Sequence, residues 1–389
     1  MLPKNLLCLC AALTLILGAG QPVQAQSDAG KSLKKETCGD LWPVERHGKW
    51  GYIDKTGRII IPLKFESTDE FSEGLAAVTI KEKTGYIDTT GKFVIPPRFI
   101  EGFPFSSGMA LVVLRSFRKG MYHFNQYGYI DRSGNLVIQV QEPLDTKSFR
   151  VLYQDKDLTF SEGLLPVTQN DKSGFMDKAG KQVIPPRYNN VHPFSEGLAA
   201  VALENKYGYI DRSGKMVIPP QFESAGPFSE GLAAVAFNGK HGYIDKSGKL
   251  VITGEEFEVE RKFSAGLAAA RGKNGKYGYI DRTGKFVIPP QFRRVGDFSE
   301  GLAAVDLVDV SWPGNLAYIN QKGQMMIKAM STFPNSPMKA EFDLHYYRFC
   351  GGVAQVSLGK KEDEDATGYI NQEGKFIWPE VTPSKKEGR

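Results

Sequence analysis

The chain has 389 residues, of which 41% are hydrophobic and 24% are charged. This balance is typical of a soluble globular protein, and it excludes a disordered polyampholyte and a protein with many membrane spans. The formal net charge of +5 comes from 49 basic and 44 acidic residues, which are scattered along the chain without a basic block. We therefore expect no nucleic-acid partner.

Residues 1–25 have the pattern of a secretory signal peptide. Lys4 precedes an apolar run at residues 6–17, and Val23-Gln24-Ala25 offers a small-residue cleavage site. The run is too short to span a bilayer comfortably, although an uncleaved anchor is the alternative. We expect cleavage after Ala25, a periplasmic or secreted protein, and no transmembrane segment after cleavage. A linker at residues 26–36 would follow.

A repeat fills residues 37–380, and residues 381–389 form a polar tail. Each unit combines a block like Phe-Ser-Glu-Gly-Leu-Ala, a string like Gly-Tyr-Ile-Asp and a block like Gly-Lys-x-Val-Ile-Pro-Pro. The second string begins at Gly51, Gly85, Gly128, Gly174, Gly208, Gly242, Gly278, Ala317 and Gly368. The nine units start near residues 37, 71, 105, 160, 194, 228, 263, 298 and 349. The period is about 34 residues, and the third and eighth units are longer.

Each unit is expected to contain three short strands. In the sixth unit these are residues 232–237, which are apolar on both faces, residues 240–244, which alternate, and residues 249–252. In most units Pro-Pro closes the third strand, because proline cannot donate to a ladder. The expected fold class is therefore all-β.

The recurring acidic residues have a structural explanation. Asp in Asp-x-x-Gly can accept a backbone hydrogen bond two residues on, and Gly supplies the positive φ that closes the hairpin. This applies to Asp54, Asp88, Asp131, Asp177, Asp211, Asp245 and Asp281. The recurring Glu73, Glu162, Glu196, Glu230 and Glu300 lie in a second turn. We expect neither set to be catalytic.

The start Trp50-Gly51-Tyr52-Ile53-Asp54 and the two flanking blocks resemble the WG-repeat family of bacterial proteins. The resemblance covers about residues 37–380, which is nearly all of the mature chain. It implies tandem β-repeats, and it implies no agreed activity. The hairpins are also loosely similar to choline-binding and cell-wall-binding repeats.

Two arrangements of the units remain open. Units of 34 residues are small for propeller blades, and nine exceed the usual four to eight, which favours an open β-solenoid-like stack. The alternative is a closed propeller-like ring. Cys38 and Cys350 hold the same place in the first and ninth units. A disulfide between them requires Cα atoms roughly 4.4–6.8 Å apart, which only the ring allows.

No catalytic or metal-binding motif is present in the sequence. The five histidines lack His-Glu-x-x-His spacing, and there is no Cys-x-x-Cys, Gly-x-Ser-x-Gly or phosphate-loop pattern. We expect no cofactor, no metal and no catalytic residue. The predicted function is that of a monomeric, non-enzymatic binding or scaffold protein for an envelope protein or a glycan. The alternative is an extracytoplasmic glycoside hydrolase with paired carboxylates, for which the candidate acids are Asp306, Asp309 and Glu341.

Two surfaces could bind a partner. One is a ladder of aromatic side chains on either side of the motif glycine, which could stack on sugars, although we favour an interior position. Its members are Trp50, Tyr127, Tyr207, His241 and Tyr277 before the glycine, and Tyr52, Tyr86, Tyr129, Tyr209, Tyr243, Tyr279, Tyr318 and Tyr369 after it.

The other surface is formed by insertions near residues 115–126, 140–158, 306–315 and 328–348, which we expect to be loops. Aromatic and arginine residues are enriched at interaction hot spots. The candidate binding residues are Arg115, Phe117, Tyr122, His123, Trp312, His345, Tyr346, Tyr347 and Arg348.

Overall fold

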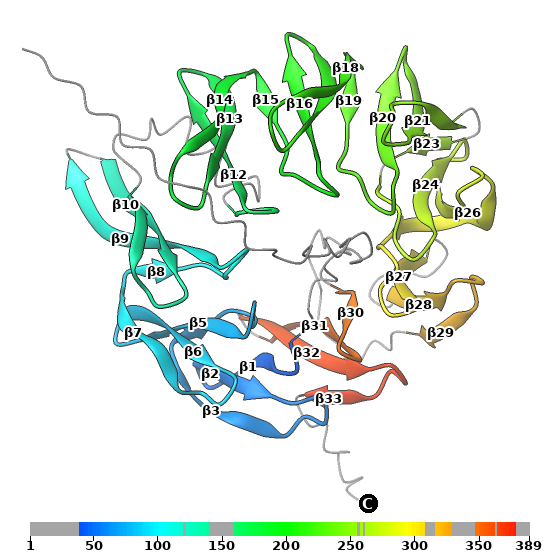
Figure 1. Ribbon diagram of the computed structural model, residues 1–389. Helices are drawn as coiled ribbons and strands as arrows, with labels where there is room; N and C mark the ends of the chain where they lie inside the picture. The colour runs from blue at the N-terminus through cyan, green and yellow to red at the C-terminus, as the bar shows by residue number, and fades with distance from the viewer. Residues whose placement is uncertain are drawn as a thin grey trace, which may run out of the picture. The chain divides into compact units, whose positions relative to one another are not determined.

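The repeats fold into small antiparallel β-sheets (Figure 1). The computed structural model describes residues 39–119, 122–139, 159–254, 257–259, 261–307, 316–328, 347–361 and 364–378. These residues all belong to the unit Thr37–Arg389, and every named element in them is a β-strand. The predicted all-β class is confirmed.

Seven of the eight sheets hold one repeat unit each. Their strands are β1 (Trp42–Arg46), β2 (Lys49–Ile53) and β3 (Ile59–Phe65); β4 (Ser67–Thr68), β5 (Leu75–Ile80), β6 (Lys83–Asp88) and β7 (Phe93–Phe99); β8 (Glu101–Gly102), β9 (Met109–Lys119), β10 (Tyr122–Asp131) and β11 (Leu136–Gln139); β12 (Leu164–Gln169), β13 (Lys172–Asp177) and β14 (Gln182–Tyr188); β15 (Asn190–Val191), β16 (Leu198–Leu203), β17 (Lys206–Asp211) and β18 (Met216–Phe222); β19 (Ser224–Ala225), β20 (Ala233–Phe237), β21 (Lys240–Ile244) and β22 (Leu250–Gly254); and β30 (Phe349–Cys350), β31 (Val353–Lys361), β32 (Glu364–Asn371) and β33 (Phe376–Trp378).

The eighth sheet joins units seven and eight in the order β23 to β29. Its strands are β23 (Phe257–Val259), β24 (Ala268–Gly272), β25 (Tyr277–Ile280), β26 (Phe286–Val295), β27 (Leu302–Leu307), β28 (Leu316–Asn320) and β29 (Met325–Lys328). The long strand β26 serves both units, because its second half pairs with β27.

The prediction of three strands per unit was wrong for most units, which have a fourth. This strand comes from residues just before the predicted start of a unit, and we count it with the unit whose sheet it joins. In unit five it is β15, which pairs with the free edge of β16 through only two residue pairs, Asn190↔Ala202 and Val191↔Val201. A segment this short shows no periodicity in the sequence, so its pairing depends on the strand beside it. The sixth-unit strands β20, β21 and β22 otherwise agree with the predicted ones within one or two residues.

We expected the Pro-Pro pair to end the third strand, and this prediction was wrong. In unit five, β18 runs through Pro219 and Pro220, and its pairing with β17 skips from Tyr209↔Ile218 to Tyr207↔Phe222. A methyl group placed on Gly208 would lie 2.7 Å from the backbone nitrogen of Pro220. The prolines therefore form a bulge over the motif glycine, and only glycine allows this close approach.

The core lies between neighbouring units. From β16, Ala199 and Val201 pack in a cluster with unit four, whereas Ala200 packs with Phe228 and Val235 of unit six. Alternate side chains of one strand point to opposite faces, so each sheet contacts both neighbours. The small alanines allow both neighbouring units to approach this strand closely.

Units nine and one also pack together. Trp42, Val44 and Ile53 share a buried cluster with Val353, Tyr369 and Trp378. The Tyr369 hydroxyl donates a hydrogen bond of 2.8 Å to the Pro43 carbonyl, and the Arg46 guanidinium lies 4.5 Å from the centre of the Trp378 ring.

Candidate functional site

The Asp-x-x-Gly turn is structural, as predicted. In unit five, Asp211 Oδ1 accepts hydrogen bonds from the Ser213 hydroxyl at 2.6 Å, the Ser213 amide at 2.9 Å and the Lys215 amide at 3.1 Å. These bonds, led by that of the Ser213 hydroxyl, lower the pKa of Asp211. Gly214 closes the turn with φ of 84°. The aspartate is fully engaged in shaping the hairpin.

The Phe-Ser-Glu-Gly block forms a two-residue turn with an uncommon backbone. Between Ser195 and Leu198, both Glu196 and Gly197 have positive φ, 53° and 85°. Glutamate rarely occupies this region, so its recurrence requires a role for its side chain.

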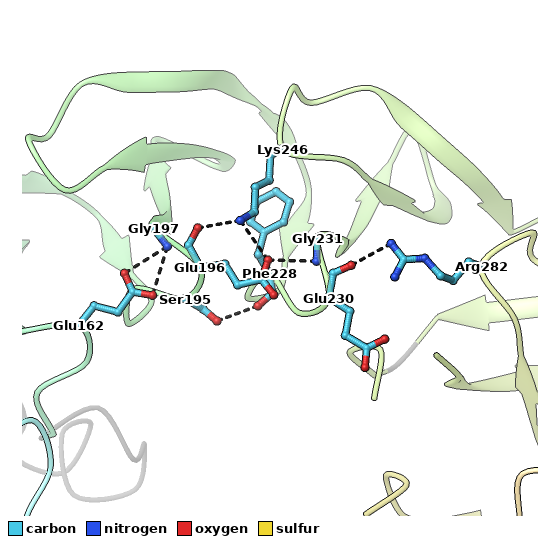
Figure 2. Close-up of polar contacts among 9 residues, drawn as sticks. All are labelled: Glu162, Ser195, Glu196, Gly197, Phe228, Glu230, Gly231, Lys246 and Arg282. Atoms are coloured by element: carbon cyan, nitrogen blue, oxygen red, sulfur yellow. Dashed lines mark hydrogen bonds and ion pairs between the residues drawn. The ribbon is translucent and has the colours of Figure 1, made fainter. Parts of the chain in front are cut away.

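That role is to join neighbouring units (Figure 2). Glu196 Oε2 accepts the Gly231 amide of unit six at 3.0 Å and lies 3.1 Å from Lys246 Nζ. Lys246 Nζ also donates to the Glu196 carbonyl at 3.0 Å. We call this arrangement of a glutamate, the next unit's glycine amide and the next unit's cation the junction contact.

A serine completes the junctions from unit two to unit nine. Ser195 Oγ donates to the Phe228 carbonyl at 2.7 Å. The same bond joins Ser72 to Phe105, Ser106 to Phe160, Ser161 to Phe194, Ser229 to Phe263, Ser264 to Phe298 and Ser299 to Phe349. The carboxylate bond to a glycine amide is made by Glu73, Glu162, Glu196, Glu230 and Glu300. The structural assignment of these glutamates is confirmed.

The tyrosines of the aromatic ladder that follow the motif glycine are interior, as we favoured. Tyr209 is completely buried and donates its hydroxyl to the Gly226 carbonyl at 2.8 Å. The tyrosines that follow the motif glycine are all at most 3% exposed, and burial raises the pKa of Tyr209 far above its ordinary value. Of the residues before the glycine, Tyr127 is buried, and the other four are half-buried.

The first insertion is a longer hairpin and not the loop that we expected. Strands β9 and β10 extend past the usual length, and Arg115 pairs with Gln126 while Phe117 pairs with Phe124. Arg115 is exposed, and Phe117 is 43% exposed. Tyr122 and His123 continue β10 opposite Lys119 and Arg118. The pairing shifts by one residue between Tyr127↔Val113 and Gln126↔Arg115 and then continues, so extra residues on both arms prolong the ladder, which length alone does not reveal.

The second set of candidates is only partly described. Tyr347 is 6% exposed and packs with Leu302, Tyr318 and Phe349, and this burial raises its pKa to about 12. The prediction that Tyr347 binds a partner was wrong, because its ring belongs to the core. Arg348 is exposed. Trp312, His345 and Tyr346 lie outside the described residues, as do Asp309 and Glu341.

Asp306 is the candidate acid that the structure describes. Its side chain is 3% exposed, and Oδ2 lies 3.0 Å from Arg294 Nη2 and 3.1 Å from Arg294 Nε. Other units carry Ala202 or Ala236 at the equivalent strand position. Sequence reasoning missed Arg294, although the charged residue among alanines was a signal that a partner was needed.

Cys350 forms a disulfide, whereas Cys38 lies outside the described residues. Within the described ranges, no three His, Cys, Asp or Glu side chains gather as they would around a metal ion. No helix in that part of the chain is long and apolar enough to cross a membrane.

The comparisons with known proteins identify the repeat. A family model described as WG containing repeat matches residues 50–83, 85–116, 127–141, 174–207, 207–240, 242–277 and 277–307. No curated protein matches the chain in sequence.

The similar solved structures are distant. PorZ, a bacterial surface component of the type-IX secretion system of Porphyromonas gingivalis, has 10% identity over 80% of this chain and 44% of its own, with a TM-score of 0.29. A prolyl endopeptidase has 10% identity over 76% of this chain and 51% of its own, with a TM-score of 0.33. AztD from Citrobacter koseri has 11% identity over 74% of this chain and 77% of its own, with a TM-score of 0.30. The chain spans less than two thirds of the first solved structures that it matches.

Proposed function

The chain belongs to the family with the WG containing repeat, and we propose that it is an exported, non-enzymatic binding protein of the cell envelope. Its partner surface is the long hairpin β9–β10, and its partner is an envelope protein or a glycan. The observation that carries this proposal is an exposed aromatic side chain on an extension that the repeat does not need.

The comparison with regular units supports this assignment. Strands β9 and β10 have 11 and 10 residues, whereas β16 and β17 have six each. The regular units build their cores without such an extension. Phe117 and Arg115 on the extension are of the types enriched at interaction hot spots.

Crosslinking from the hairpin tests the proposal. A photoreactive amino acid replaces Phe117 in one variant and Phe237 in the other, which is 38% exposed on a hairpin of regular length. In cells that express and export the protein, we expect a discrete crosslinked adduct from position 117 alone. The mass of the adduct distinguishes a protein partner from a glycan. Adduct formation should fall in the Arg115→Ala background. Equal adducts from both positions, or none from position 117, would contradict the proposal. The same mass spectrum tests cleavage after Ala25.

We also propose that the nine units close into a propeller-like ring and that Cys38 is the disulfide partner of Cys350. The shared cluster of units one and nine supports closure. A methyl group placed on Gly351 would lie 3.3 Å from the Gly39 carbonyl oxygen, so the residues after the two cysteines are neighbours. Non-reducing peptide mapping should yield a linked Cys38–Cys350 peptide from the monomer, and two free thiols would overturn closure by this bond.

The hydrolase alternative has no observation in its favour. Asp306 is engaged in an ion pair with Arg294, and Asp309 and Glu341 lie outside the described residues. Binding is therefore the function that we propose.

A further inference from the structure

One junction between units lacks its glutamate. At the turn of unit three, Ser107 stands where Glu73 stands in unit two and Glu162 stands in unit four. Ser107 has φ of 53°, the same as Glu73 and Glu196. The backbone of the turn is therefore unchanged, and only the carboxylate is missing.

The groups that bind the carboxylate elsewhere are still present at this junction. The amide of Gly163 in unit four corresponds to the Gly231 amide, which Glu196 accepts. Lys178 corresponds to Lys246, which pairs with Glu196. Methyl groups placed on Gly108 and Gly163 would lie 4.0 Å from Lys178 Nζ and 3.8 Å from Lys178 Cε, so this side chain lies between the two turns. Among the described residues, Lys178 has no ion pair.

Other junctions without the glutamate have also lost the cation. Unit seven has Ala265 at this turn, and Gln321 of unit eight replaces the cation and donates to the Ala265 carbonyl at 2.9 Å. Unit one has Gly39 at this turn, and unit two has Thr89 in place of the cation. Only the Ser107 junction, among those inside the chain, keeps a cation without an acid. Arg212, the cation of the next junction, adds positive charge nearby, because a methyl group on Gly163 would be 3.7 Å from Arg212 Nη2.

We propose that the Ser107–Gly163–Lys178 junction is a binding site for a carboxylate supplied by a peptide partner, in the form of a glutamate side chain. A charge-assisted bond from the Gly163 amide and an ion pair with Lys178 would hold it, as Glu196 is held by Gly231 and Lys246. The occupant is a peptide glutamate because that group fills the same geometry at five other junctions of this chain. This site is separate from the hairpin β9–β10 and does not depend on that proposal.

A labelled peptide with the chain's own turn sequence is the direct probe. Fluorescence anisotropy measures the binding of fluorescein-labelled Phe-Ser-Glu-Gly-Leu, blocked at its other end, to the mature full chain. The matched peptide has glutamine in place of glutamate, and glucuronate is the competitor that represents an acidic sugar. We expect saturable binding of the glutamate peptide, and binding of the glutamine peptide about tenfold weaker.

Variants place the binding at the junction. Ser107→Glu should supply the missing carboxylate in cis, abolish peptide binding and raise the melting temperature by about 2 °C. Ser107→Gln, which has the same length without the charge, should not raise it. Lys178→Gln should weaken binding about fivefold, whereas Lys215→Gln, an exposed lysine of unit five, should leave it unchanged. Phe117→Ala should leave it unchanged too, which separates this site from the hairpin.

Several results would overturn the proposal. These are equal binding of the two peptides, unchanged binding in Ser107→Glu, no saturable binding of the glutamate peptide, and stronger displacement by glucuronate than by unlabelled glutamate peptide.

Discussion

Units five and six meet differently from units nine and one. Between five and six, Ser195 and Glu196 reach the backbone of the next unit, and Lys246 pairs with the same glutamate. In unit nine, Cys350 and Gly351 hold the serine and glutamate positions. There Cys350 is in a disulfide, and Trp378 and Tyr369 pack against unit one.

The difference follows from the covalent chain. Consecutive units are tethered by the chain, and hydrogen bonds of about 1 kcal/mol each add to the apolar cluster that they share. Units nine and one have no such direct tether. Buried aromatic rings, among them Tyr369 and Trp378, stabilise this contact, and the disulfide of Cys350 adds to it if Cys38 is its partner.

The largest expected effect is that of Cys350→Ser, which removes the disulfide of unit nine. The serine matches the other units, so the turn should still form. If Cys38 is the partner, loss of a crosslink over so long a loop should lower the free energy of unfolding by about 5 kcal/mol. Urea denaturation of the oxidised wild type and the variant measures this. A difference below about 1 kcal/mol would mean that the bond contributes little to closure.

Alanine substitutions at the motif glycines test whether unit one is packed as tightly as unit five. A methyl group on Gly51 would lie 2.8 Å from the Leu63 nitrogen, much as one on Gly208 would lie 2.7 Å from that of Pro220. Gly51→Ala and Gly208→Ala should each cost about 3 kcal/mol of stability. Gly226→Ala is the control, since its nearest neighbour would be 3.5 Å away. A much smaller loss for Gly51→Ala would show that the terminal unit is packed more loosely.

Asp69 lies at the junction of units one and two, where its carbonyl accepts the Tyr52 hydroxyl. Burial raises the pKa of its carboxyl group to about 6, with Glu101 and Glu70 contributing. The folded state then holds the proton more tightly than the unfolded state, so stability falls as pH rises from about 4 to about 6. Asp69→Asn should remove this loss. The unfolding free energy of the variant relative to the wild type should therefore be about 2 kcal/mol more favourable to folding at pH 7 than at pH 4. Urea midpoints at both pH values test it, and an identical difference between wild type and variant at the two values would contradict it.

The smallest expected effect concerns one tyrosine hydrogen bond at each of the two junctions. Tyr369 and Tyr209 each donate a hydrogen bond of 2.8 Å to a carbonyl of another unit, Pro43 and Gly226. Tyr369→Phe and Tyr209→Phe should therefore cost about 1 kcal/mol each. Calorimetry of the two variants measures this. A loss for Tyr209→Phe with none for Tyr369→Phe would argue that units nine and one do not pack as internal neighbours do.

Much of each unit could be predicted from its residues. The hairpin β20–β21, the Asp-x-x-Gly turn and the structural role of the glutamates depend on alternation and turn chemistry within a few residues. The fourth strand could not be predicted, because two residues carry no period. The buried position of Tyr347 and the pairing of Asp306 with Arg294 depend on which strands become neighbours.

The repeat, its period and the all-β class can be predicted from the residues, because these features follow from local preferences that recur in every unit. The bulge of the prolines over the motif glycine and the interior position of Tyr209 and its counterparts became clear from the folded chain. It alone also brought Tyr369 to Pro43. Such features arise from contacts between residues far apart in the chain, and the energy of those contacts depends on packing that no single unit contains.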